Sequence, residues 1–211
     1  MNKITKVEVQ KNNKKRVNIY VNENFAFACD MELVYRYNLA KDAEIKIEDI
    51  REVLIEEEYI SCKNYTLRIL ERGYKTEKEI EKKLIEREYS QETISRVQDF
   101  LKEYNFIDDR RYTSMYVKDK IKNEGRNKIK YKLMQKGVAE ETIAKTINNV
   151  NEEDEYEGAL ALCEKKYRIL IKRETDSRLI KQKIFRFLAS KGYDFDLINR
   201  IIRKVVNEEY E

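Results

Sequence analysis

Apolar residues recur along most of this chain at the spacing of amphipathic helices. From residue 59 onward they stand three or four positions apart, which places them on one side of an α-helix. The arrangement around Ile80 returns 49 residues later at Ile129 and another 55 residues later at Ile184. A period of about 50 residues predicts one supersecondary unit that occurs three times. The corresponding apolar positions are Ile80/Ile129/Ile184, Leu84/Leu133/Leu188, Tyr89/Val138/Tyr193, Ile94/Ile143/Ile198 and Leu101/Val150/Val205.

Each repeat is predicted to contain three helices. Thr76 and Glu79 have the spacing of a capping box, which marks a helix start. Lys136-Gly137 and Lys191-Gly192 place a cation in a last helical turn and a glycine just beyond it, as helix ends favour. The expected helices cover residues 60–72, 76–88 and 90–104, then 108–124, 126–136 and 140–150, and finally 153–173, 176–190 and 194–207.

The first 28 residues follow a different pattern, in which apolar and polar positions alternate. Residues 4–10 and 16–22 are predicted strands joined by a polar turn, and residues 25–28 form a third short run. Two helices are expected next, over residues 31–37 and 47–58. Because two strands alone are marginally stable in water, this sheet should pack on a helix.

These patterns predict a mainly α-helical fold: three tandem three-helix repeats in an elongated, curved array, preceded by a small N-terminal β-hairpin/helix unit. The chain has no proline and only five glycines, which fits long helices. We expect an N-terminal β-strand and helix extension over residues 1–58, followed by helical repeats over residues 59–105, 106–150 and 151–211.

The composition argues against several kinds of site. There is no histidine, and Cys29, Cys62 and Cys163 lie far apart, so we expect no metal site and no cofactor. Scattered thiols fit a reducing cytosol better than a disulfide framework. No stretch resembles a signal peptide or an apolar run of about 18 residues, which predicts a cytoplasmic protein without a membrane partner. We expect it to be a monomer.

Asp108-Asp109 is the pair of acids that most invites a catalytic interpretation. Paired carboxylates can bind metal or share a proton, but acids at a helix start also satisfy unpaired N–H groups and the helix dipole. No histidine or third acid cluster completes a catalytic site, and no P-loop, G-x-S-x-G or H-E-x-x-H motif occurs. We therefore interpret both acids as structural and predict that the protein has no catalytic residue and is not an enzyme.

Positive charge is concentrated in the middle of the chain. Residues 107–150 hold eleven Lys/Arg and six Asp/Glu, a net charge of +5, whereas the whole chain carries +4. A run of charge is usually a solvated surface, but two basic helices joined at Gly125 favour an anionic partner equally well. The predicted nucleic-acid or filament-binding residues are Arg110, Arg111, Lys118, Lys122, Arg126, Lys128, Lys130, Lys132 and Lys136.

A helical wheel separates the basic and apolar positions of these two helices. The residues expected to face outward are Arg111, Lys118, Lys122, Lys128 and Lys132. The residues expected to be buried are Val117, Ile121, Ile129 and Leu133.

The basic region also carries a recognisable motif: Phe106-Ile107-Asp108-Asp109-Arg110-Arg111-Tyr112, then Gly125, Ile129, Leu133 and Lys136-Gly137-Val138. It resembles the central signature of the RecX family of regulatory proteins. The first repeat, with Leu67, Leu70, Arg72, Thr76, Glu79, Ile80 and Leu84, is similar to that family's first repeat. The strands around Ile4-Thr5-Lys6-Val7 and Asn18-Ile19-Tyr20-Val21 look like the extension of its longer members. One departure is Thr113, where the family usually has alanine.

The resemblance implies a non-enzymatic regulator that binds the RecA–single-stranded DNA filament. Such a protein inhibits the recombinase, ATPase and co-protease activities of RecA and so acts in DNA repair, DNA recombination and the SOS response. The implied partners are the RecA filament and single-stranded DNA, with double-stranded DNA left open. The residues alone also fit a helical-repeat DNA-binding protein without a RecA partner, or a scaffold whose basic face binds nothing specific.

Overall fold

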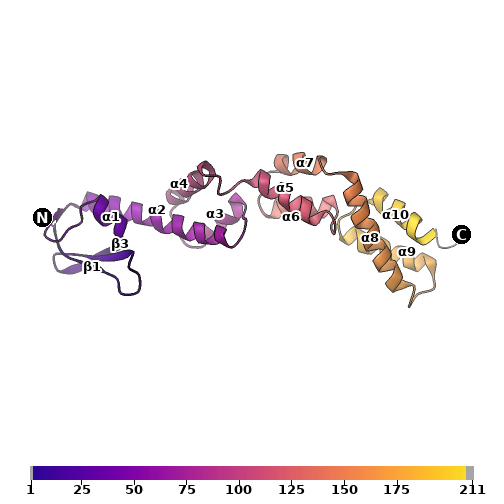
Figure 1. Cartoon of the computed structure of the whole chain (residues 1–211), viewed down its shortest axis with the longest axis horizontal. Coiled ribbons are helices and arrows are strands. Elements are labelled where there is room, and N and C mark those ends of the chain that lie inside the picture. The colour runs from indigo at the N-terminus through magenta and orange to yellow at the C-terminus, as the bar shows by residue number, and fades with distance from the viewer. Residues whose placement is uncertain (1, 208–211) are drawn as a thin grey trace. The chain divides into compact units, whose positions relative to one another are not determined.

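The computed structural model describes residues 2–207, which form one small sheet and ten helices (Figure 1). The strands are β1 (Asn2–Val9), β2 (Arg16–Val21), β3 (Asn24–Asp30) and β4 (Glu44–Ile45). The helices are α1 (Met31–Arg36), α2 (Ile47–Glu71), α3 (Glu77–Ile85), α4 (Gln91–Glu103), α5 (Asp109–Lys120), α6 (Arg126–Gln135), α7 (Glu140–Asn148), α8 (Glu152–Leu170), α9 (Ser177–Ser190) and α10 (Phe195–Asn207).

The chain divides into two compact units. The first unit comprises Met1–Tyr74 and Ile80–Phe106, and the second comprises Lys75–Glu79 and Ile107–Glu211. The first turn of α3 therefore belongs with the second unit, although the rest of that helix belongs with the first.

The N-terminal sheet confirms the three predicted strands and adds a fourth. The strand order is β3-β2-β1-β4, and all neighbours are antiparallel. The sequence did not predict β4, since its two residues are too short for alternation to be recognised. Ile4, Val17 and Ile19 turn one face of the sheet toward Val53 and Ile60 of α2. The sheet thus packs on a helix, as expected for so few strands.

Helix α2 corrects one of the sequence-based expectations. Separate helices were predicted over residues 47–58 and 60–72, but a single helix runs from Ile47 to Glu71 and passes through the expected boundary at residue 58. Neither glycine nor proline interrupts this segment, so nothing in the backbone forces a break. The helix ends at Arg72, before Gly73 adopts a φ of 137°.

The middle helices of the three repeats, α3, α6 and α9, confirm the predicted correspondence. All six residues of the first two sets are fully buried, with 0% exposure: Ile80, Leu84, Ile129, Leu133, Ile184 and Leu188. The fifth set fits less well, because Leu101 is buried whereas Val150 and Val205 are only half-buried. Apolar periodicity therefore located the centre of each repeat better than its last helix.

The middle helices also end in the same way. The Val138 and Gly137 N–H groups donate to the Leu133 and Met134 carbonyls at 3.1 and 2.9 Å. This is the Schellman arrangement, in which the residue after the cap has positive φ. The φ of Gly137 is 79° and that of Gly192 is 89°. In the first repeat the residue is Glu88, which adopts the strained value of 61°.

Two junctions in the second unit follow one plan. The start of a middle helix contacts the C-terminal turn of the middle helix in the next repeat. At the first junction, the Thr76 hydroxyl donates to the Lys136 carbonyl at 2.6 Å. At the second, the Gly125 N–H donates to the Lys191 carbonyl at 3.0 Å. A Cβ on Gly125 would lie 2.4 Å from the main chain of Gly192, so only glycine permits this approach.

Candidate filament-binding surface

The two acids of the central motif both act as helix caps, but on different helices. The Asp108 carboxylate accepts the N–H groups of Arg110 and Arg111 at 2.9 and 3.0 Å, which caps α5 as expected. The Asp109 carboxylate instead accepts the Glu77 N–H at 3.0 Å and so caps α3. Burial raises the pKa of Asp109. The structural interpretation of Asp108 is confirmed, and Asp109 has an inter-repeat role that the sequence did not predict.

Helix α5 presents its cations to solvent. Val117 and Ile121 are buried, as is Thr113, whose hydroxyl donates to the Asp109 carbonyl at 2.6 Å. Four predicted binding residues are exposed: Arg110, Arg111 and Lys118 on α5, and Lys122 just beyond its end. The Thr113 hydroxyl therefore has a hydrogen-bond partner within its own helix. Because Thr113 is buried, having threonine in place of the family's usual alanine does not alter the exposed face of α5.

The cations of α6 were predicted to bind a partner, but in the structure they contact groups of the protein itself. Arg126, Lys128, Lys130, Lys132 and the C-cap residue Lys136 are all only half-exposed. The Lys132 ammonium lies 2.5 Å from a Glu124 carboxylate oxygen, and the Lys128 ammonium donates to the Ser190 carbonyl at 3.0 Å. The expectation that Lys128 and Lys132 face outward is thus wrong, because nearby acceptors in the second unit draw these side chains inward. Lys130 pairs with Glu140 at 2.8 Å.

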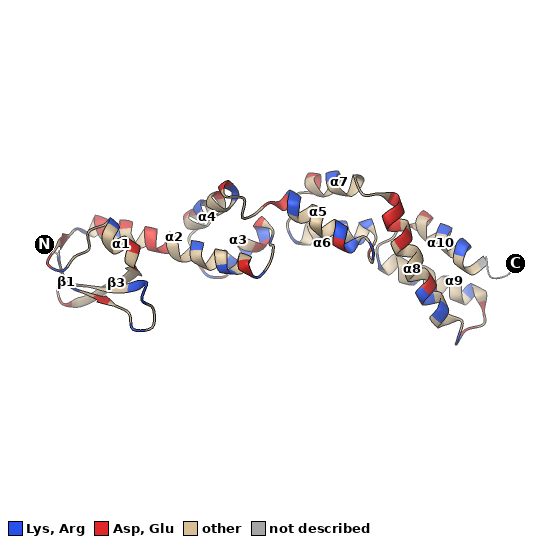
Figure 2. Cartoon of the chain, in the orientation of Figure 1, with Lys and Arg blue, Asp and Glu red and all other residues tan. Residues whose placement is uncertain are grey.

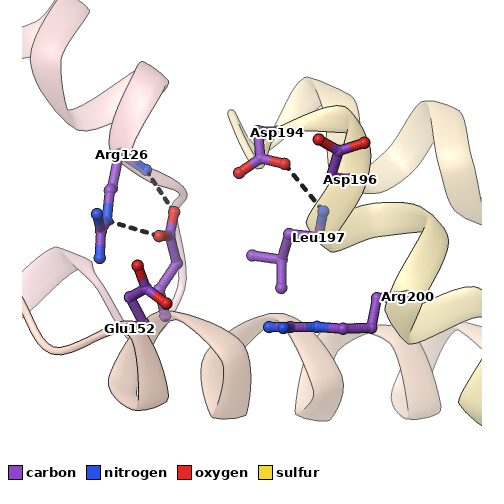
Figure 3. A pocket seen from close by; sticks show the side chains of 7 residues that line it. Arg126, Glu152, Asp194, Asp196, Leu197 and Arg200 are labelled. Atoms are coloured by element: carbon purple, nitrogen blue, oxygen red, sulfur yellow. Dashed lines mark hydrogen bonds and ion pairs between the residues drawn. The ribbon is translucent and has the colours of Figure 1, made fainter.

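Arg126 forms the most buried of these contacts, shown in Figure 3. Its Nε lies 2.7 Å from a carboxylate oxygen of Glu155, which is only 6% exposed. The same carboxylate accepts the Arg126 N–H at 2.9 Å and caps α6. Glu155 in the third repeat therefore acts on α6 as Asp109 acts on α3. A helical wheel of one repeat cannot reveal this pair, because its acid comes from the next repeat.

Lys136 takes part in the first junction. Its ammonium lies 2.6 Å from a Glu79 carboxylate oxygen and 5.7 Å from the centre of the Tyr112 ring. Burial acts to raise the pKa of Glu79, but the hydrogen bonds from Lys136 and from the Thr76 N–H outweigh it and hold that pKa below its ordinary value. The Thr76 and Glu79 side chains also form the predicted capping box, with bonds of 3.1 and 3.2 Å. The ion pair between Lys136 and Glu79 therefore helps to order the junction, and the Lys136 ammonium is already paired within the protein.

A second basic region lies on α9 and α10, and the sequence analysis missed it. Helix α9 contains Arg178, Lys181, Lys183 and Arg186 and no acid, and Figure 2 shows blue segments on it as on α6. The absence of acids from this 14-residue segment could have predicted the second basic region from the sequence. It was overlooked because charge was summed around the central motif.

No group of three or more His, Cys, Asp or Glu side chains within residues 2–207 could hold a metal ion. Burial raises the pKa of each cysteine thiol, Cys29, Cys62 and Cys163, to about 12, so these thiols are poor nucleophiles. Over the same residues, every helix is too short or too polar to cross a membrane.

The fold and its junctions define a class of protein: tandem three-helix domains behind a small β unit. Domain models of the RecX family match the chain throughout. The RecX N-terminal domain matches residues 2–46, and the first, second and third three-helix domains match residues 62–101, 108–147 and 152–202. The chain belongs to the RecX family of regulatory proteins.

Named relatives and a solved structure agree with this assignment. A regulatory protein RecX of Clostridium perfringens (strain 13 / Type A) is 51% identical over 210 residues, covering 100% of this chain and 99% of that protein. One of Clostridium tetani (strain Massachusetts / E88) is 43% identical over 206 residues, covering 98% and 95%. A crystal structure of regulatory protein RecX superposes with a TM-score of 0.73 at 28% identity, covering 95% of this chain and 98% of that one.

Proposed function

We propose that this protein is a non-enzymatic regulator of the RecA recombinase. It binds the RecA–single-stranded DNA filament and inhibits the recombinase, ATPase and co-protease activities of RecA, and it thereby modulates DNA repair and recombination. It works in the cytoplasm as a monomer. The observation that carries this proposal is family membership over all four domains, supported by relatives that are named regulatory proteins.

The exposed face of α5 is the part of the predicted site that best suits contact with the filament. Lys118 on α5 and Lys122 just after its end are both exposed, whereas Val117 is buried. Arg110 lines a groove of about 300 Å³ together with Ser114, Glu141 and Lys145, and Lys145 pairs with Glu141 at 2.6 Å. Arginine, lysine and hydroxyl groups are the usual donors to phosphate oxygens.

The α6 cations are weaker candidates, because each would leave its intramolecular partner when it bound phosphate. Removing Lys132 from Glu124, or Arg126 from Glu155, leaves a largely buried carboxylate without its cation. We therefore assign filament contact first to the exposed Lys118 and Lys122, keep Arg110 and Arg111 as candidates beside them, and treat Arg126, Lys128, Lys130, Lys132 and Lys136 as residues that shape the neighbouring surface.

The experiment is RecA-catalysed ATP hydrolysis on saturating single-stranded DNA, with this protein added in substoichiometric amounts. We expect strong inhibition that persists when extra bare DNA is supplied. Inhibition that bare DNA relieves would instead indicate a DNA-binding protein without a RecA partner. If the protein neither inhibits ATP hydrolysis nor binds DNA, the proposal is refuted and a scaffold role remains. A variant with Lys118 and Lys122 changed to glutamine should inhibit more weakly at the same concentration.

A further inference from the structure

A groove between α9 and α10 combines an apolar floor with a cationic rim. Phe185 and Ile202 form the floor, and Ile202 is only 7% exposed. Lys181 and Arg186 line it from α9 and Arg203 lines it from α10, and Gln182 and Asn199 complete the lining. The groove has a volume of about 650 Å³, enough to accommodate several side chains of a partner.

The charge of this groove is one-sided. Among residues 2–207, no Asp or Glu lines it, and α9 contains none anywhere along its length. Arg186 and Arg203 are both exposed, in contrast to Arg126 of α6, which is paired with Glu155. Exposed arginines in a groove lined by no carboxylate of the described residues attract an anionic partner and orient it.

The apolar part of the groove continues onto the surface. The Phe195 ring meets the Phe185 ring edge to face, with 5.5 Å between ring centres and 70° between planes. Phe195 is nevertheless 66% exposed, although burying a phenylalanine is among the larger hydrophobic gains available to a fold. Exposed aromatic rings next to arginines are the side chains that most often dominate protein interfaces.

We propose that this groove binds an amphipathic, acidic helical segment of a partner protein. Apolar side chains of that segment cover Phe185, Ile202 and Phe195, and its flanking Asp or Glu side chains meet Arg186 and Arg203. A groove between two packed helices suits this mode of recognition, in which apolar residues at helical spacing fill the groove.

A protein segment fits the groove better than nucleic acid does. Phosphate binding requires only the cations and leaves the hydrocarbon floor without a purpose. A base placed on that floor would lose water from its polar edges, whereas a leucine or phenylalanine side chain has no such edge to desolvate. The groove lies on helices other than α5, so this proposal stands independently of the contacts assigned above.

Binding of a model peptide to the full chain tests the proposal. The probe is a fluorescein-labelled helix of leucine and glutamate, with leucine at positions i, i+3, i+4 and i+7, followed by fluorescence anisotropy. A scrambled peptide of the same composition, with leucine on all sides, is the peptide control. We expect the scrambled peptide to bind at least about tenfold more weakly, because it cannot present an apolar face and an acidic rim together.

Two matched variants separate the groove from overall charge. The rim variant, Arg186→Glu with Arg203→Glu, reverses the charge of the groove rim. The control variant, Lys172→Glu with Arg178→Glu, makes the same change of charge at exposed residues outside the groove. We expect the rim variant to bind the ordered peptide at least about tenfold more weakly and the control to bind within about twofold of the original protein. Phe195→Ser, at an exposed position, should weaken peptide binding about fivefold without altering the helical circular dichroism.

Several outcomes would overturn the proposal. The first is equal binding of the ordered and scrambled peptides, and the second is an equal effect of the rim and control variants on peptide binding. The third is a rim variant that loses more affinity for a single-stranded oligothymidine than for the peptide. The last result would assign the groove to nucleic acid. If the rim variant unfolds, Arg186→Gln and Phe195→Ser carry the same comparison. RecA inhibition is measured in parallel, so failure of this inference and failure of the proposed function give different results.

Discussion

Helices α6 and α9 hold corresponding positions in the second and third repeats, yet their cations are paired to different extents. Each contains four Lys or Arg residues and no acid. In α6 all four cations contact acceptors of the second unit: Glu155, Ser190, Glu140 and Glu124. In α9, Lys183 pairs with Glu174, whereas Arg178 and Arg186 are exposed. The net charge of a helix therefore does not measure the charge available to a partner.

Position in the repeat series accounts for two of the α6 contacts, those of Arg126 and Lys128. Helix α6 is followed by a repeat whose first helix begins with four acids, Glu152 to Glu155, seen as the red start of α8 in Figure 2. One of these acids reaches back to Arg126. No repeat follows α9 within residues 2–207, so no such acid is supplied to it. Arg126 is thus paired by an acid of the next repeat, whereas α9 has no next repeat among the described residues.

Removal of the Glu155 carboxylate should have the largest effect on stability. Glu155→Gln leaves the half-buried Arg126 without its ion pair and weakens the cap of α6. We expect a loss of about 3 kcal/mol in the free energy of unfolding, since breaking a buried pair strands its partner. Urea unfolding followed by circular dichroism measures it, with exposed Glu152→Gln as the control. Equal stabilities of the two variants would contradict the comparison.

A pair of single substitutions compares the two helices directly. Lys132→Gln strands the mostly buried Glu124 carboxylate and should cost about 1–2 kcal/mol. Arg186→Gln removes an exposed cation and should change stability by no more than about 0.5 kcal/mol. The same unfolding measurement serves both, and a similar loss in the two variants would show that α9 is as firmly paired as α6.

The fold was more predictable than this use of charge. Burial of Ile80, Ile129 and Ile184 followed from periodicity, because each residue faces the core of its own repeat. The contacts of Lys128 and Glu155 did not follow, because their partners lie 62 and 29 positions away in another repeat. A helical wheel describes one helix in isolation and contains no information about acids that a neighbouring helix brings. The continuous α2 was also not predicted, although no glycine or proline interrupts residues 47–71.

Acid should affect the two C-cap lysines differently. Because the folded-state pKa of Glu79 is depressed, its stabilising contribution is present above its ordinary value of 4.5 and is lost as the pH falls through the lower folded value. Lys136→Gln removes the cation responsible and should flatten the decline of stability below pH 4.5. Lys191, which lies over the Phe187 ring, is the matched control, and Lys191→Gln should leave the decline unchanged. Thermal melts from pH 7 downward test this, and identical profiles would refute it.

The smallest effect on stability is expected on α5. Changing the exposed Lys118 and Lys122 to glutamine should alter stability by no more than about 0.5 kcal/mol each. If both residues contact phosphate, the slope of log affinity against log salt for single-stranded DNA should fall by about 0.7 for each contact. Anisotropy of a labelled oligonucleotide across a salt series measures the slope. An unchanged slope would show that the α5 face is only a solvated surface.

The Gly125 junction also makes particular amide protons into reporters. The N–H groups of Gly125 and Asn127 end on the carbonyls of Lys191 and Gly192, at 3.0 and 3.3 Å, so each crosses from the second repeat to the third. Their hydrogen–deuterium exchange requires the two repeats to part, but does not require α6 or α9 to unwind. Exchange at these amides as slow as at the helix interiors would identify the two repeats as one cooperative block. Exchange faster than in the helix interiors would give the free energy needed to separate the second repeat from the third at these hydrogen bonds.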